Sequence, residues 1–352
     1  MNTNKRQSGI ELMRIISIFM IMIVHATYLT FGFPSLDDVR TEPIKMFGYI
    51  GMENITIICV NVFVLISGWF SIKPTIKNVG GLIFQCLFFG ILVQLFLYCK
   101  GISTLSLKSV NAIITFLPFV NSYIVLCLIA PILNAYCEKV SKLSFRNFLV
   151  VFYLWGFTMG WLLNKDMEFY LGKTVICFIG LYLLARYIRL HVVFSNKYDK
   201  ACVWGGAWAI SVLFLTIFEV ILAQFSITGK LSLLLMGFSI SYISPFVIIN
   251  SLLFFLCFRK FNFSSNMVNW IAISAFASVL LHGNMEGEYY CPMISQLYEN
   301  NPFLIFLIKA FCFMSAFFVV GFALDKVRIY LWTKVCPVVE SLRDKIVSPN
   351  NN

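Results

Sequence analysis

The sequence predicts an all-α integral membrane protein built as a single bundle of about ten transmembrane helices. Hydrophobic residues make up 60% of the chain and charged residues only 12%, whereas soluble domains have about 45–50% and about 25%. Apolar runs long enough to cross a bilayer, about 20 residues each, recur from one end of the chain to the other. Both observations indicate that lipid, rather than water, surrounds most of this protein.

Short polar segments separate the apolar runs. One transmembrane domain is expected over residues 1–330, followed by a basic cytoplasmic tail over residues 331–352. The first run follows a basic start, as in a signal peptide, but no small-residue cleavage site follows it, so we expect a helix that is retained. The predicted spans cover residues 10–31, 47–70, 79–99, 113–136, 145–163, 170–188, 202–223, 235–258, 266–283 and 303–325.

The distribution of basic residues predicts the orientation of the chain. Of the 27 Lys and Arg residues, 19 fall at the N-terminus, in the loops on its side and in the tail, and eight on the opposite side. Loops rich in Lys and Arg remain in the cytoplasm, so both termini are expected there, in the inner (plasma) membrane. The net charge of +11 does not indicate nucleic-acid binding, because the basic residues form no single patch.

Cysteine and histidine usage predicts neither a disulfide scaffold nor a metal site. The 11 cysteines are scattered, mostly inside apolar runs, and the chain has only three histidines. No C-x-x-C pair occurs. We expect no metal and no permanently bound cofactor.

The first span carries two ionisable residues, Arg14 and His25. Eleven residues at 100° each make three turns plus about 20°, so both side chains share one helix face, roughly 16 Å apart along the axis. The Arg14 guanidinium could bind phosphate and the His25 imidazole could lie near a thioester, which would suit a long ligand such as acyl-coenzyme A. The alternative is a snorkelling arginine and a histidine satisfied within the bundle.

Other intramembrane ionisable residues are also functional candidates, because charge in a bilayer is costly. Glu53, at the start of the second span, could orient His25 or pair with a cation, or could be an interfacial carboxylate in water. His282 ends the ninth span, where it is a site residue or an interfacial cap. The remaining candidates lie near span ends and could each snorkel: Lys173, Glu219 and Lys309.

Several motifs occur in a fixed order. Arg14 and His25 form an R-x10-H pair, and further motif segments lie at Asn61–Phe70, Ser122–Tyr123 with Pro131 and Asn134, Ile179–Tyr182, Ser278–His282 and Asp325–Arg328. This combination resembles the membrane acyltransferase-3 family, in the form of a stand-alone polysaccharide O-acetyltransferase without an SGNH domain. The sequence departs from the family pattern at Gly283, where an aspartate is expected.

The resemblance implies an O-acyltransferase that moves an acyl group, usually acetyl, from acetyl-coenzyme A to a hydroxyl of a capsule or other cell-envelope carbohydrate. It implies that His25 is the general base and that Arg14 binds the coenzyme A phosphates. Glu53 or His282 would orient His25 or the acceptor. The implied partners are acyl-coenzyme A, a carbohydrate acceptor, the lipid bilayer, and a second copy of the chain or the polysaccharide assembly machinery.

Two other classes remain open. A transporter or flippase of a polysaccharide precursor would also use many helices and intramembrane charges, although transporters often show repeats and paired broken helices, and no repeat is visible here. It would work without acyl-coenzyme A. A catalytically silent assembly partner would tolerate replacement of His25.

Overall fold

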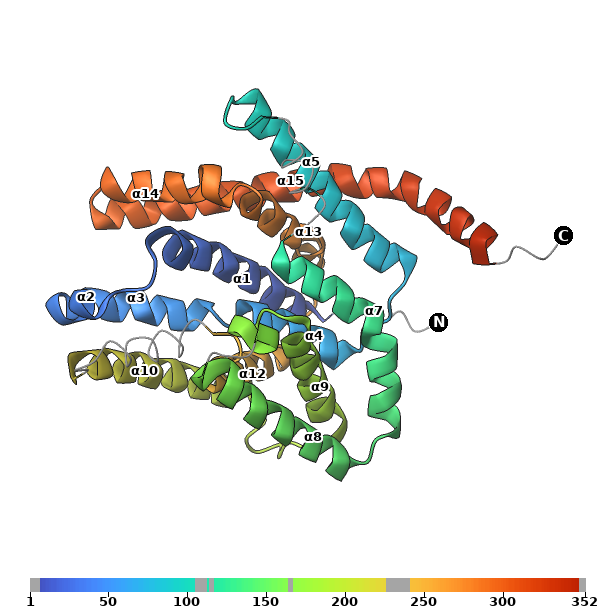
Figure 1. The fold of residues 1–352 in the computed structure, drawn as a ribbon, viewed down its shortest axis with the longest axis horizontal. Coiled ribbons are helices and arrows are strands. Elements are labelled where there is room, and N and C mark those ends of the chain that lie inside the picture. Colours follow the sequence, from blue (N-terminus) through green and yellow to red (C-terminus); the bar gives the residue numbers. More distant parts are fainter. Residues whose placement is uncertain (1–6, 105–112, 114–116, 164–166, 226–240, 348–352) are drawn as a thin grey trace. The chain divides into compact units, whose positions relative to one another are not determined.

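The computed structural model describes residues 7–104, 113, 117–163, 167–225 and 241–347. These residues form helices and no strand, which confirms the all-α class (Figure 1). The elements in chain order are α1 (Ser8–Val24), η1 (His25–Leu29), α2 (Leu36–Thr41), α3 (Pro43–Thr56), α4 (Cys59–Phe70), η2 (Ile76–Gly80), α5 (Gly81–Cys99), α7 (Pro118–Lys139), α8 (Lys142–Trp155), η3 (Gly156–Leu162), η4 (Met167–Gly172), α9 (Val175–His191), α10 (Ala201–Phe225), α12 (Pro245–Arg259), α13 (Asn266–Gly283), η5 (Glu286–Tyr290), α14 (Cys291–Glu299) and α15 (Phe303–Val347).

Within the described ranges, seven helical segments are long and apolar enough to cross a membrane, and the chain is a multi-pass membrane protein. They are Ser8–Leu29, Pro43–Phe70, Ile76–Cys99, Pro118–Lys139, Ala201–Gln224, Asn266–Gly283 and Phe303–Asp344. The other predicted spans coincide with α8 followed by η3, with α9 and with α12, of which α9 has 17 residues and α12 has 15. Residues 114–116 and 235–240 of the predicted spans lie outside the described residues, and the count of ten stays a prediction.

The chain divides into two compact units. The first comprises Met1–Ile72 and Ile132–Ala272, and the second comprises Lys73–Pro131 and Ile273–Asn352. The division falls within α7 and within α13. The predicted boundary at residue 330 falls within α15, which continues as a helix to Val347.

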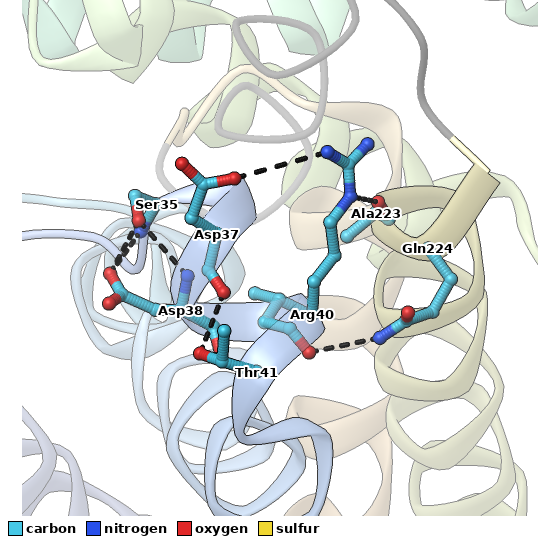
Figure 2. Close-up of polar contacts among 8 residues, drawn as sticks. Ser35, Asp37, Asp38, Arg40, Thr41, Ala223 and Gln224 are labelled. Carbon is cyan, nitrogen blue, oxygen red and sulfur yellow. Dashed lines mark hydrogen bonds and ion pairs between the residues drawn. The ribbon is translucent and has the colours of Figure 1, made fainter.

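In the first unit, the short helix α2 is capped at its start and attached to the end of α10 (Figure 2). The Ser35 hydroxyl accepts the Asp38 backbone N–H, and the Asp38 carboxylate accepts the Ser35 backbone N–H at 2.9 Å. These hydrogen bonds hold the pKa of Asp38 below its usual value. Arg40 Nε donates to the Ala223 carbonyl at 3.1 Å, and Gln224 donates to the backbone of α2. The cap and these contacts fix the loop that leads into α3.

Close approach of α4 and α9 forms the centre of the first unit. A Cβ atom at Gly68 would lie 2.9 Å from the Ala185 Cβ and would overlap the Tyr182 carbonyl oxygen. Small residues at helix contacts let backbones approach in membranes, where packing replaces the hydrophobic effect as the driving force. Gly68 therefore sets the distance between the two helices.

The backbone that leaves α4 is held at Ile72. Its N–H donates to the Tyr182 hydroxyl at 3.1 Å, and its carbonyl accepts the Asn134 side-chain amide at 3.0 Å. The Tyr182 hydroxyl in turn donates to the Asn134 Oδ1 at 2.6 Å. Two side chains from α9 and α7 thus satisfy a backbone group that helix α4 no longer pairs.

In the second unit, α15 packs against α13 and α5. A Cβ atom at Gly321 would lie 2.9 Å from the Ser278 Cα, so the glycine allows α15 to approach α13 closely. Asp325 is completely buried. Its Oδ1 accepts Gln85 at 2.8 Å and lies 2.7 Å from an Arg328 nitrogen. This network ties α5 to α15 and balances the charge of the buried carboxylate.

Replacement of Gly68 by alanine should lower the free energy of unfolding by about 1–3 kcal/mol, because the added methyl group forces α4 and α9 apart. The matched control is Gly48→Ala, since a Cβ atom at Gly48 meets nothing within 4 Å. Thermal unfolding of both variants in the same detergent measures the difference. Equal midpoints for the two variants would contradict the close packing described here.

Candidate functional site

His25 lies where the first helix changes its geometry. The α-helical hydrogen bonding of α1 ends at Val24, and the next five residues form the π-helix η1. The carbonyl of His25 accepts the Thr30 hydroxyl at 2.8 Å. Single π-turns inside helices occur frequently at functional sites. The half-buried His25 therefore lies on a turn that is wider than the helix before it.

The Glu53 carboxylate binds the residues that follow His25. Glu53 lies on α3 and is 3% exposed. It accepts hydrogen bonds from the Thr27 hydroxyl and from the Tyr28 backbone N–H. An unpaired carboxylate is very costly to bury, so these two donors are necessary for Glu53 to remain at this position. In return, Glu53 fixes the π-turn that carries His25 against α3.

Tyr242 completes the surroundings of Glu53. Its side chain interacts electrostatically with Glu53 and Tyr28, and its ring lies 5.8 Å from the Lys173 ammonium. The Asn61 side-chain amide donates to the Tyr242 carbonyl at 2.9 Å, which fixes this segment against α4. A buried carboxylate and a phenol thus lie near the turn that follows His25, and the Lys173 ammonium lies beside the phenol ring. We call His25, Thr27, Tyr28, Glu53 and Tyr242 the histidine cluster.

The residue after Glu53 joins α3 to α10. The Asn54 Nδ2 donates to the Glu219 carboxylate at 2.8 Å and lies 3.2 Å from the Thr216 hydroxyl. All three side chains are buried, with Glu219 only 2% exposed. Glu219 is one of the candidates that the sequence identified, and here its contact is to the helix that carries Glu53. Its described contacts therefore assign it to the support of α3.

Arg14 forms an ion pair that the sequence analysis missed. Its guanidinium lies 3.1 Å and 3.2 Å from the two oxygens of Glu11, one turn earlier on α1. Glu11 is buried, whereas the Arg14 side chain is 35% exposed. The carboxylate holds the guanidinium in one orientation and leaves part of it accessible.

His282 belongs to the second unit and is completely buried. Its Nδ1 lies 2.6 Å from the Ser278 carbonyl oxygen. A carbonyl only accepts hydrogen bonds, so Nδ1 carries the proton and Nε2 is the basic nitrogen. The imidazole lies 4.9 Å from the Tyr290 ring, centroid to centroid. Lys309, also in this unit, donates to Asn301 at an exposed position.

Of the four predicted site residues, the structure brings two into one cluster. Glu53 bonds Thr27 and Tyr28 on the π-turn that begins at His25, and Arg14 lies earlier in the chain, on α1. His282 lies in the other unit. In the part of the chain that the structure describes, no three His, Cys, Asp or Glu side chains are placed to hold a metal ion.

The sequence indicates the remaining site residues to different degrees. Glu11 had a clear signal, because it is an acid one helical turn from Arg14 within a span. Thr27 and Tyr28 are polar residues directly after His25, which is a weaker indication. Tyr242 had none, since only the fold brings it near Glu53.

Comparison of the chain with protein-family models, with curated proteins and with solved structures finds no match. The resemblance to the acyltransferase-3 family therefore stays a prediction from the motifs. Three of the motif residues have a structural role here, because Asn134 and Tyr182 hold Ile72 and Asn61 holds Tyr242.

Replacement of Asn54 by leucine should destabilise the protein by about 1–3 kcal/mol, because it removes a donor from the buried Glu219. The double variant Asn54→Leu/Glu219→Met should recover most of this loss, since both polar partners are then apolar. Thermal unfolding of the native protein, the two single variants and the double variant forms a complete cycle. Strictly additive losses would show that the two side chains do not interact.

Proposed function

We propose that this chain is a membrane-embedded O-acyltransferase that moves an acyl group, acetyl in the first instance, from acyl-coenzyme A to a carbohydrate hydroxyl. The observation that carries the proposal is the π-turn at His25, held by the buried Glu53 through Thr27 and Tyr28. A general base must be held in place to act within hydrogen-bond distance of its proton. The family resemblance supplies the reaction class.

His25 is the general base of the proposed reaction. Its imidazole takes the proton from the acceptor hydroxyl as the hydroxyl oxygen attacks the acyl carbonyl carbon. The tetrahedral intermediate collapses with cleavage of the carbon–sulfur bond. The imidazolium returns its proton to the leaving thiolate, and the products are an O-ester and free coenzyme A. An acyl-histidine relay would use the same residue in two steps.

Arg14 binds a phosphate of the donor in this proposal. Glu11 holds the guanidinium through two of its contacts, and the exposed part of the guanidinium can bind phosphate oxygens. Arg14 lies roughly 16 Å before His25 along the helix axis, which matches a donor whose phosphates and thioester are far apart. In the predicted orientation, this end of α1 faces the cytoplasm, where acyl-coenzyme A is made.

A host strain with the gene deleted tests the proposed reaction and the role of His25. Native protein should restore ester-linked acetyl on the purified surface polysaccharide, and His25→Ala should reduce it by about a hundredfold or more, because the general base is lost. Proton NMR of the polysaccharide measures the ester. Membrane expression is matched between strains.

His191→Ala is the matched control, because His191 packs against Phe145 and Tyr187 away from the histidine cluster. It should restore the ester. Full activity of His25→Ala would overturn the proposed mechanism. If deletion of the gene leaves the acyl esters unchanged but alters polysaccharide export, the protein is a transporter and not an acyltransferase.

Thr27→Val should lower kcat about tenfold while the KM for acyl-coenzyme A stays the same, because Glu53 loses a donor and the turn at His25 loosens. Thr27→Ser should retain the native kcat. The rate of thiol release by protein in nanodiscs, with polysaccharide from the deletion strain as acceptor, measures both constants.

The matched control for Thr27 is Thr158→Val. Thr158 also lies in a π-helix, η3, and its hydroxyl oxygen likewise lies 2.8 Å from the carbonyl oxygen four residues earlier. The same loss of kcat in both variants would show that the bond to Glu53 is not the cause.

A further inference from the structure

A basic and aromatic group gathers at the C-terminal end of α9, apart from the histidine cluster. Arg189 is exposed, and its guanidinium carbon lies 5.1 Å from the centre of the Trp69 ring and 5.7 Å from that of Phe70. Arg186, one turn earlier, is 8% exposed. In the predicted orientation, this end of α9 is at the cytoplasmic side.

The fold holds these side chains in fixed positions. Gly68 brings the end of α4 against α9, and the bonds of Tyr182 and Asn134 to Ile72 fix the backbone just after Trp69. The guanidinium of Arg189 therefore stacks on rings whose backbone is anchored on both sides. A stacked guanidinium keeps its N–H edge available for an anion.

A third arginine, Arg259, also lies over the Trp69 ring, at 5.3 Å, and its carboxylate partner Asp199 is already used by other cations. Asp199 lies 2.5 Å from an Arg259 nitrogen and 2.9 Å from the Lys260 ammonium, and it also accepts the Trp204 ring N–H. Neither Arg186 nor Arg189 forms an ion pair with any described residue. The positive charge of these two arginines is thus left without an acidic partner in the described part of the chain.

Arg186 indicates a bound anion more strongly than Arg189 does. Its Nε is buried, and no hydrogen-bond partner lies near it among the described residues. The Cys137 thiol contacts its guanidinium, but a thiol is a weak acceptor and does not neutralise the charge. The helix dipole explains an arginine in the last turn, such as Arg189. It does not satisfy a buried donor one turn earlier, and burying an unpaired charge is costly.

We propose that Arg186 and Arg189, beside the Trp69 ring, bind a phosphate group. A guanidinium offers its N–H groups in a planar fork that matches phosphate oxygens, and two guanidiniums one turn apart can bind one phosphate together. The phosphate belongs either to the nucleotide part of coenzyme A, which rests on the proposed function, or to the headgroup of an anionic phospholipid.

The test is direct binding to the full chain in phosphatidylcholine nanodiscs. Isothermal titration should show that coenzyme A binds the native protein and that the affinity falls at least tenfold in Arg189→Gln and in Arg186→Lys. The lysine variant keeps the positive charge but loses the planar set of guanidinium N–H groups. Lys142→Gln is the control for loss of one positive charge, because Lys142 is exposed at the start of α8. It should bind as the native protein does.

A second arm distinguishes the source of the phosphate. Native mass spectrometry from nanodiscs that contain phosphatidylglycerol should show a retained lipid, lost in both arginine variants, if the headgroup is the ligand. If the arginine variants lose affinity for coenzyme A, the site binds the acyl donor. Unchanged binding in both arms, with the variants folded by their thermal midpoints, overturns the proposal. If the variants bind coenzyme A more weakly but the native protein forms no acyl ester, the phosphate site stands and the proposed function is refuted.

Discussion

The absence of water inside a bilayer is the constraint on which the described contacts of this protein depend. A polar group within the hydrocarbon region must find its partner in the protein. Glu53 finds donors on the turn after His25, Asn54 finds Glu219 on α10, and Asn61 finds the backbone at Tyr242. Each bond joins two different elements, so the polar side chains of α3 and α4 decide which helix faces meet.

Close packing supplies the second part of the architecture. Apolar side chains gain little from leaving lipid, so helices associate through small residues that allow many short contacts. Gly68 permits α4 to reach α9, and Gly321 permits α15 to reach α13. In the first unit, this contact also aligns Trp69 with Arg189. A packing requirement therefore positions the side chains that we assign to phosphate binding.

The same two requirements connect the fold to the proposed chemistry. The backbone of the π-turn at His25 is fixed by the Thr30 hydroxyl at the His25 carbonyl and by the Glu53 contact with Thr27. Such over-determination is how proteins hold a catalytic group in place. Arg14 is held in a comparable way by Glu11, through an ion pair within one turn.

The sequence by itself determined that lipid surrounds the protein and that its class is helical, because hydropathy is a local property. It also predicted that Arg14 and His25 share one helix face. It also marked Glu53 and Glu219 as intramembrane charges. Only the tertiary structure decided what these residues bind. Asn54 and Glu219 are 165 residues apart in the chain, and the π-turn at His25 is stabilised by Glu53 on a different helix. Neither feature has a local signature, since each arises from contacts that exist only after the helices have packed.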